Sequence, residues 1–154
     1  MSDSNRELIQ RFYDELWNRF DKEKIAELLT ADLEFRGSLG DEIVGHLEFA
    51  AYMDKIRAAF PDFHNQVEEV VTEGDRAFAR LTYSGTQRGS ILGIAPTNRQ
   101  VTYAGVANFR FRDGKIAGVW VLGDIHGLLR QLDQPQLASS TRQQPQRSRQ
   151  TPPI

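Results

Sequence analysis

The sequence lacks several features that would narrow its chemistry. It contains no cysteine, which excludes disulfide bonds, thiol nucleophiles and thiolate metal sites and fits a reducing compartment. No apolar run approaches the ~18–20 residues that a membrane-spanning helix needs, and the polar stretch Met1–Arg11 has no apolar signal core. We therefore expect a cytoplasmic protein without a membrane partner.

An excess of either charge is also missing. The 154 residues include 19 Lys and Arg against 21 Asp and Glu, so there is no basic surplus to attract nucleic acid. The three histidines, His46, His64 and His126, are scattered without metal-ligand spacing. The sequence has no G-x-S-x-G elbow, phosphate-binding loop, G-x-G-x-x-G or H-E-x-x-H motif. We expect no metal, no cofactor and no nucleic-acid partner.

The chain is long enough for one domain, but its last stretch differs from the rest. Residues 134–154 are rich in Gln, Pro, Ser and Arg and contain no acidic residue. Such a segment buries too little apolar surface to offset the entropy of ordering it. We predict a folded domain over residues 1–133 and a disordered tail over 134–154. The alternative is a nucleic-acid-binding or partner-binding arm, but the tail's three arginines are scattered and without aromatics, which argues against it.

A helical first third precedes a strand-rich remainder. Apolar residues at helical spacing predict a helix over Asn5–Arg19, a short one after an Asp21 cap, and a third over Leu47–Phe60 that Pro61 ends. Strands are expected over 33–36, 67–71, 77–84, 101–111 and 116–122, with a last helix over 125–132. Three helices followed by antiparallel strands indicate an α+β fold, with helices on one face of a curved sheet.

One acidic residue stands out at the end of the last predicted strand. Asp124 closes the otherwise apolar segment from Val119, and alternation along a strand places Trp120, Leu122 and Asp124 on one face. A carboxylate in such apolar surroundings is partly desolvated, which suits it to proton transfer near neutral pH. Asp124 also directly precedes a predicted helix, where Asp is a favoured N-cap. The two interpretations are compatible, because a cap can face a cavity.

The dipeptide Asp113–Gly114 predicts a two-residue hairpin turn before this strand. In that register Tyr103 lies opposite Asp124 and Ala107 opposite Trp120, and a single bulge would shift both pairs.

Four groups of residues, taken in order, resemble a known family. They are Phe12-Tyr13-x-Glu15-Leu16-Trp17-Asn18; Phe60-Pro61-Asp62-Phe63-His64 followed by Glu73-Gly74-Asp75; Thr86-x-x-Gly89-x-x-x-Gly93-x-x-Pro96-Thr97; and Phe109-Arg110-Phe111-x-Asp113-Gly114-Lys115-Ile116 with Trp120-x-x-x-Asp124 and Leu129-x-Gln131-Leu132. Over about residues 6–132 their order and spacing resemble the SnoaL-like polyketide cyclases, also called ester cyclases.

This resemblance implies a ketosteroid-isomerase-like cone, in which a curved antiparallel sheet and three N-terminal helices enclose one pocket for a flat, apolar or polycyclic carbonyl ligand. It also implies a homo-oligomer, a dimer or tetramer, and an intramolecular aldol cyclisation that needs neither metal nor cofactor. The family's acid/base aspartate matches Asp124. Many members carry a Glu-His pair just before the tryptophan, whereas this chain has Gly118-Val119, so His46 or His126 would have to replace that histidine.

On this hypothesis Asp124 is the catalytic acid/base of a cyclase or isomerase. A hydrogen bond to the developing oxyanion would come from Tyr103, His46 or Asn108. The apolar pocket would be lined by Tyr13, Trp17, Met53, Phe60 and Trp120.

Two alternatives stay open. One is a non-catalytic protein that binds a small apolar molecule. The other is an epoxide-hydrolase-like enzyme on the same cone, which needs a second acid and an arginine beside Asp124; Asp62 and Arg110 are the candidates.

Overall fold

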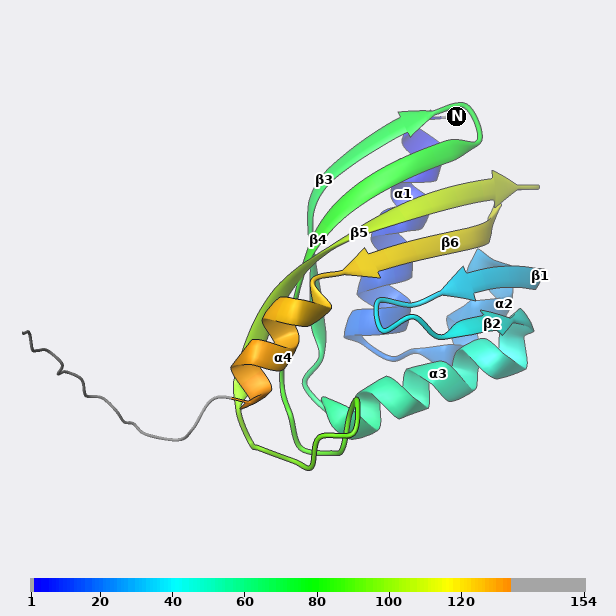
Figure 1. The fold of residues 1–154 in the computed structure, drawn as a ribbon. Coiled ribbons are helices and arrows are strands. Elements are labelled where there is room, and N and C mark those ends of the chain that lie inside the picture. The colour runs from blue at the N-terminus through cyan, green and yellow to red at the C-terminus, as the bar shows by residue number, and fades with distance from the viewer. Residues whose placement is uncertain (1, 134–154) are drawn as a thin grey trace, which may run out of the picture.

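A computed structural model describes residues 2–133 of the chain (Figure 1). The predicted tail, 134–154, lies outside the described residues. In chain order the elements are α1 (Ser2–Arg11), the π-helix η1 (Phe12–Asn18), the 3₁₀-helix η2 (Lys22–Lys24), α2 (Ile25–Leu28), β1 (Leu29–Arg36), β2 (Glu42–Val44), α3 (Gly45–Ala59), β3 (His64–Glu73), β4 (Arg76–Thr86), β5 (Gln100–Arg112), β6 (Lys115–Gly123) and α4 (Ile125–Asp133).

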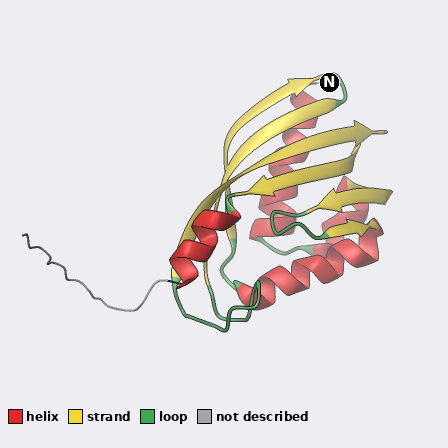
Figure 2. Cartoon of the chain, viewed as in Figure 1, coloured by secondary structure: helices red, strands yellow, loops and turns green. Residues whose placement is uncertain are grey.

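The six strands form one curved, unclosed sheet in the order β2-β1-β6-β5-β4-β3. Helices α1 and α3 cover its concave face, and α4 lies at the end of the long strand β5 (Figures 1 and 2). The fold is therefore the predicted α+β cone, with one correction to the expected pairing. Strand β1 runs parallel to β6, whereas the other neighbours are antiparallel.

The predicted first helix changes type partway along. It begins as α1 and continues as η1, which brings Phe12, Tyr13, Leu16 and Trp17 inside the molecule. A π-helix is rare and often marks a functional site. The second helix starts as expected at Asp21, whose side chain accepts a hydrogen bond from the Glu23 amide at 3.2 Å.

Strict alternation of buried and exposed residues along β4 and β5 gives the sheet an apolar inner face. The inner face and the helices share one core, which holds most of the chain's aromatic residues. Within residues 2–133 no helix is long and apolar enough to span a membrane.

The hairpin between β5 and β6 forms at the predicted turn, but its register shifts soon afterwards. Asp113 and Gly114 both have positive φ values, as a two-residue turn of this kind requires. The pairing Arg112↔Lys115 follows, and then a bulge leaves Ala117 as an extra residue on β6.

The bulge overturns the two cross-strand pairs that the turn alone predicts. Trp120 lies opposite Asn108 instead of Ala107. The Asp124 amide donates a hydrogen bond to the Ala104 carbonyl at 2.9 Å, one residue along from the predicted partner Tyr103. The side-chain period of a strand is two, so one inserted residue moves every later side chain to the other face. Trp120 and Leu122 consequently point away from the core, and Val119 and Val121 point into it.

Candidate functional site

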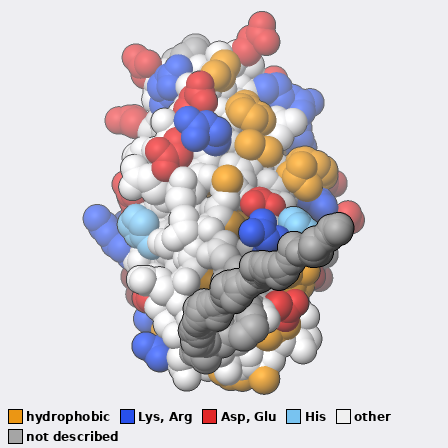
Figure 3. All heavy atoms as spheres, turned by 60° about the vertical axis from the view of Figure 1, so that its left-hand side comes forward, with side chains coloured by type: hydrophobic (Ala, Val, Ile, Leu, Met, Phe, Trp, Pro, Cys, Tyr) orange, Lys and Arg blue, Asp and Glu red, His pale blue; other side chains and the backbone are white. Residues whose placement is uncertain are grey.

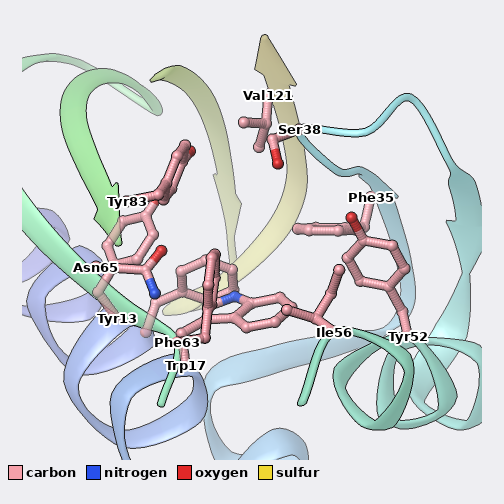
Figure 4. Close-up of a pocket in the computed structure, with 11 residues that line it drawn as sticks. Tyr13, Trp17, Phe35, Ser38, Tyr52, Ile56, Phe63, Asn65, Tyr83 and Val121 are labelled. Carbon is pink, nitrogen blue, oxygen red and sulfur yellow. The ribbon is translucent and has the colours of Figure 1, made fainter. Parts of the chain in front are cut away.

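An aromatic pocket lies between the inner face of the sheet and helices η1 and α3 (Figure 4). About 340 Å³ of space separates its walls, the open mouth included. The lining residues are Phe12, Tyr13, Trp17, Phe35, Ser38, Tyr52, Ile56, Phe63, Asn65, Tyr83 and Val121. None is charged, so the site favours an uncharged, largely apolar ligand. The cavity enclosed between the walls is only about 30 Å³, far below the ~300–1,000 Å³ of ligand pockets, so any ligand larger than a few water molecules would have to move the walls apart.

Trp17 is the centre of the aromatic wall. Its ring stacks on Phe35 at a centroid distance of 6.3 Å and meets Tyr52 and Phe63 edge-on at 5.9 and 6.1 Å. Such stacked and edge-to-face pairs add to the stabilisation from burial alone. The π-helix thus supplies a rigid side to the pocket.

All four tyrosines of the chain are buried at or beside this pocket. Tyr83 and Tyr103 are direct cross-strand partners, with ring centroids 5.0 Å apart. Glycines make room for the rings: a Cβ added to Gly105 would overlap the ring of Tyr83, and one added to Gly37 would overlap the hydroxyl of Tyr52. The rings of Tyr83 and Tyr52 therefore occupy space that side chains at positions 105 and 37 would fill.

The tyrosine hydroxyls are hydrogen-bond donors at neutral pH. Burial raises the pKa of Tyr13, Tyr52 and Tyr83 well above the usual value near 10. Burial also raises the pKa of Tyr103 to about 12, although a hydrogen bond with Ser38 opposes the rise. The phenols thus stay protonated and can polarise a ligand carbonyl, but they cannot remove a proton from carbon.

One edge of the pocket carries a hydroxyl pair. Ser38 Oγ lies 3.3 Å from the hydroxyl oxygen of Tyr103. Gly123 packs against both residues: a Cβ there would lie 2.9 Å from the Cβ of Ser38 and 3.4 Å from the ring of Tyr103. The next residue is Asp124, so its Cα is about 3.8 Å from that of Gly123 along the chain.

Asp124 itself is exposed and is not a lining residue of the aromatic pocket. Its Oδ1 accepts a hydrogen bond from the Gly127 amide at 2.9 Å, so it caps α4. The expectation that Asp124 sits in apolar surroundings is wrong, because the Ala117 bulge moves this stretch off the inner face. Its acid/base role stays a prediction.

Besides the Ser38–Tyr103 pair, a polar contact between Asn18 and Asn65 joins the π-helix to the edge strand β3. The Asn18 side chain accepts a hydrogen bond from the Asn65 backbone amide at 2.7 Å and donates one to the Asn65 carbonyl at 3.1 Å. Asn18 thereby satisfies both backbone groups of Asn65 as a neighbouring strand would. The contact fixes η1 against the sheet.

The remaining predicted pocket residues lie in three environments. Tyr13 and Trp17 line the pocket. Met53 and Phe60 are buried in the core but are not among the lining residues. His46 is partly buried at the start of α3, where its Nε2 lies 3.0 Å from the Leu29 carbonyl oxygen, so the structure does not bring it to the pocket.

Two further predicted residues, Trp120 and Asn108, lie on the outer face of the sheet. Trp120 is 49% exposed and stacks beneath the guanidinium of Arg36, at 4.6 Å. Both residues line a groove on that face, not the aromatic pocket. Trp120 is moved off the predicted apolar pocket by the Ala117 bulge. Asn108 cannot be the predicted hydrogen-bond donor inside the pocket, because alternation along β5 places it on the opposite face from Tyr103 and Ala107.

The two candidates for an epoxide-hydrolase site, Asp62 and Arg110, are held by partners other than Asp124. Arg110 forms an ion pair with Glu34 at 2.9 Å beside the outer groove. Asp62 accepts hydrogen bonds from the Thr86 amide at 2.7 Å and from its hydroxyl at 2.8 Å. Neither has a contact with Asp124. Among residues 2–133 no three His, Asp or Glu side chains gather in a way that could hold a metal ion.

Sequence reasoning missed most of the polar lining, namely Ser38, Tyr52, Asn65 and Tyr83. A signal was present for Asn65, because Phe63, just before β3, and Asn65 and Val67 within it alternate and place an amide on an otherwise apolar face. Ser38 follows β1 in a loop, where no periodicity assigns a direction.

Comparison with known proteins supports this fold and shows the family. The family model of the SnoaL-like polyketide cyclases matches residues 7–132. The structure resembles TsrD from Streptomyces laurentii, with a TM-score of 0.75 and 28% identity over 85% of this chain and 96% of that one. IdmH, a candidate polyketide cyclase from Streptomyces antibioticus, gives 0.72 and 26% over 82% and 96%. A candidate SnoaL-like polyketide cyclase from Jannaschia sp. CCS1 gives 0.79 and 24% over 86% and 94%, which is a likeness of fold. No curated protein matches the sequence.

Proposed function

Because the chain belongs to the SnoaL-like polyketide cyclase family, we propose that it is a cyclase- or isomerase-type enzyme that moves a proton next to the carbonyl group of a flat, uncharged substrate. The observation that carries this proposal is the aromatic pocket, whose polar groups are all uncharged and include protonated tyrosines. Such a pocket binds an apolar carbonyl compound and stabilises negative charge on its oxygen.

In the proposed reaction Asp124, the residue that directly follows β6, acts as the base. Its carboxylate removes a proton from the carbon next to the carbonyl, and the enolate spreads over the conjugated system of the substrate. The Ser38–Tyr103 hydroxyl pair, which packs against the neighbouring Gly123, donates a hydrogen bond to the enolate oxygen. Removing one such donor typically costs about 2.7–4 kcal/mol of transition-state stabilisation.

The enolate carbon then attacks a second carbonyl of the same molecule and forms the new carbon–carbon bond. The resulting alkoxide takes the proton back from Asp124, which returns to its charged form. Every proton and electron pair is accounted for within substrate and side chain, so the proposed cyclisation needs no cofactor. An isomerase would return the proton to a different carbon instead.

The proposal is tested with 2-tetralone, a flat bicyclic ketone with acidic protons beside its carbonyl. Proton NMR in deuterium oxide follows the exchange of those protons with and without the protein, in the same buffer. We expect the protein to accelerate exchange. An unchanged exchange rate with the ketone demonstrably bound would contradict the proposed chemistry.

A second candidate function is a non-catalytic binding protein. The observation that favours it is the absence of any acidic or basic side chain from the lining of the aromatic pocket in the described part of the chain, together with the exposed, capping position of Asp124. Tight binding without accelerated exchange would support this candidate.

A further inference from the structure

The hydroxyl of Tyr13 is the least satisfied polar group of the pocket. Tyr13 is 2% exposed, and its oxygen has no hydrogen-bond partner within residues 2–133. A buried hydroxyl without an acceptor costs stability, so such groups are few and call for an explanation. The Tyr13 hydroxyl lies in a wall of the pocket, and its lack of a partner lowers the stability of the folded protein.

Asn65 offers a second free polar atom. Its backbone groups are taken by Asn18, and its side-chain nitrogen lies 3.4 Å from the same Asn18 oxygen. Its side-chain oxygen makes no hydrogen bond in the described part of the chain, although the residue is only 4% exposed and lines the pocket. Asn65 therefore offers an acceptor to whatever occupies the space.

The two groups lie at the same end of the pocket. Asn65 is the direct cross-strand partner of Tyr83, and Tyr83 is close enough to Tyr13 to affect its pKa. Figure 4 shows Tyr13, Asn65 and Tyr83 together on one side, with Tyr52 and Ile56 on the opposite side. An unused donor and an unused acceptor thus lie at the same end of an apolar space.

We propose that Tyr13 and Asn65 form a subsite that recognises a phenolic or enolic hydroxyl of a flat aromatic ligand. The Tyr13 hydroxyl donates a hydrogen bond to the ligand oxygen, and the ligand hydroxyl donates one to the side-chain oxygen of Asn65. A hydrocarbon satisfies neither group. A carboxylate meets no cationic partner in the lining and loses its hydration. The subsite rests on the proposed function in that the aromatic pocket holds the substrate.

The test compares three probes of similar shape by equilibrium dialysis against the full chain: 1-naphthol, naphthalene and 1-naphthoate. One net hydrogen bond corresponds to roughly a fivefold change in affinity. We expect 1-naphthol to bind at least five times more tightly than naphthalene, and 1-naphthoate to bind more weakly than both.

Two variants locate the preference. Tyr13→Phe should reduce the ratio of naphthol to naphthalene affinity to near one, and Asn65→Leu should lower it as well. Because Tyr13→Phe also removes an unsatisfied buried hydroxyl, its melting temperature should equal or exceed that of the wild type, which shows that the fold is intact. Thr30→Val is the matched control, since it removes the other buried hydroxyl without a partner in the described residues and lies outside the pocket. It should leave the ratio unchanged.

A Tyr13→Phe variant that keeps the wild-type preference for 1-naphthol would overturn the subsite, as would a wild-type protein that binds neither naphthol nor naphthalene. Failure of the proposed function has a different signature. The preference would follow Tyr13 and Asn65 as expected, while the exchange of 2-tetralone protons would stay at the buffer rate.

Discussion

The ring of Tyr83 lies directly against Gly105 on the neighbouring strand, so that a Cβ at position 105 would overlap a ring carbon and come within 2.8 Å of the hydroxyl oxygen. Gly105 is buried on the inner face of β5. The absence of a side chain there lets the ring of Tyr83 stand where it can line the pocket and meet Tyr103. One residue of the sheet, Gly105, thus determines the position of a residue that lines the pocket.

Gly105→Ala should therefore displace the Tyr83 ring. Overpacking of this kind costs about 1–3 kcal/mol, and we expect the free energy of unfolding in urea to fall by that amount, together with weaker binding of 1-naphthol. The control is Gly118→Ala, whose added carbon would meet only the flexible end of the Arg110 side chain on the outer face. Equal effects of the two substitutions would show that the Gly105–Tyr83 contact is unimportant.

The buried tyrosines should not ionise near pH 10, which absorbance can check. Each has its pKa raised by burial, to about 12 for Tyr103 and well above the usual value near 10 for the other three. Since the chain has no other tyrosine, phenolate absorbance at 295 nm should not rise near pH 10 while the protein is folded. One tyrosine that ionises near pH 10 in the folded protein would contradict the buried cluster.

The same shifts fix the direction of the stability change. Above pH 10 the unfolded chain releases its phenolic protons while the folded protein keeps them, so the folded state binds more protons and stability falls as pH rises from 10 towards 12. Below pH 10 these groups contribute no pH dependence. Melting temperatures measured from pH 8 to 11.5 should decline only in the upper part of that range.

The outer face of the sheet predicts self-association. Phe78, Trp120 and Leu122 are 44, 49 and 52% exposed there, and hydrophobic side chains lie among charged ones of both signs in Figure 3. Exposed apolar side chains with both charges around them suit a second copy of the same surface. We expect a homo-dimer, with twice the mass of one chain by light scattering.

Leu122→Glu should convert this dimer to a monomer. Leu47→Glu is the matched control, because Leu47 is 88% exposed on α3, away from the outer face. A wild-type monomer, or a dimer that survives Leu122→Glu, would contradict this assignment of the interface.

The α+β fold was predictable from the sequence because helical spacing, strand alternation and the Asp113–Gly114 turn each act locally, whereas the cone was expected only from the resemblance to the family. The candidate site was predictable only in part. Tyr13 and Trp17 follow from the helical pattern that buries them, and a π-helix keeps them inside. Trp120 was assigned to the wrong face because a single extra residue, Ala117, turns the later side chains of β6 to the opposite face of the sheet. No local pattern in the sequence indicates that bulge.

Asn65 and Ser38 escaped prediction for another reason. Their position in the pocket depends on long-range packing: β3 against the π-helix through Asn18, and the loop after β1 against Gly123 and Tyr103. Alternation around Asn65 indicates which face its side chain takes but not which segment it packs against, and the loop that holds Ser38 has no periodic signal.

The central claim is that this chain performs proton transfer with Asp124, and the exchange of 2-tetralone protons by Asp124→Asn tests it most directly. Asn caps a helix about as well as Asp, so the substitution should keep the fold and the binding of 1-naphthol. Asp124→Ala should instead lose about 0.5–2 kcal/mol of stability with the cap. If Asp124 is the acid/base, the protein-catalysed exchange rate of Asp124→Asn falls by about 10²–10⁴-fold. An Asp124→Asn protein that exchanges the ketone's protons as fast as the wild type would contradict the account and leave Asp124 a helix cap.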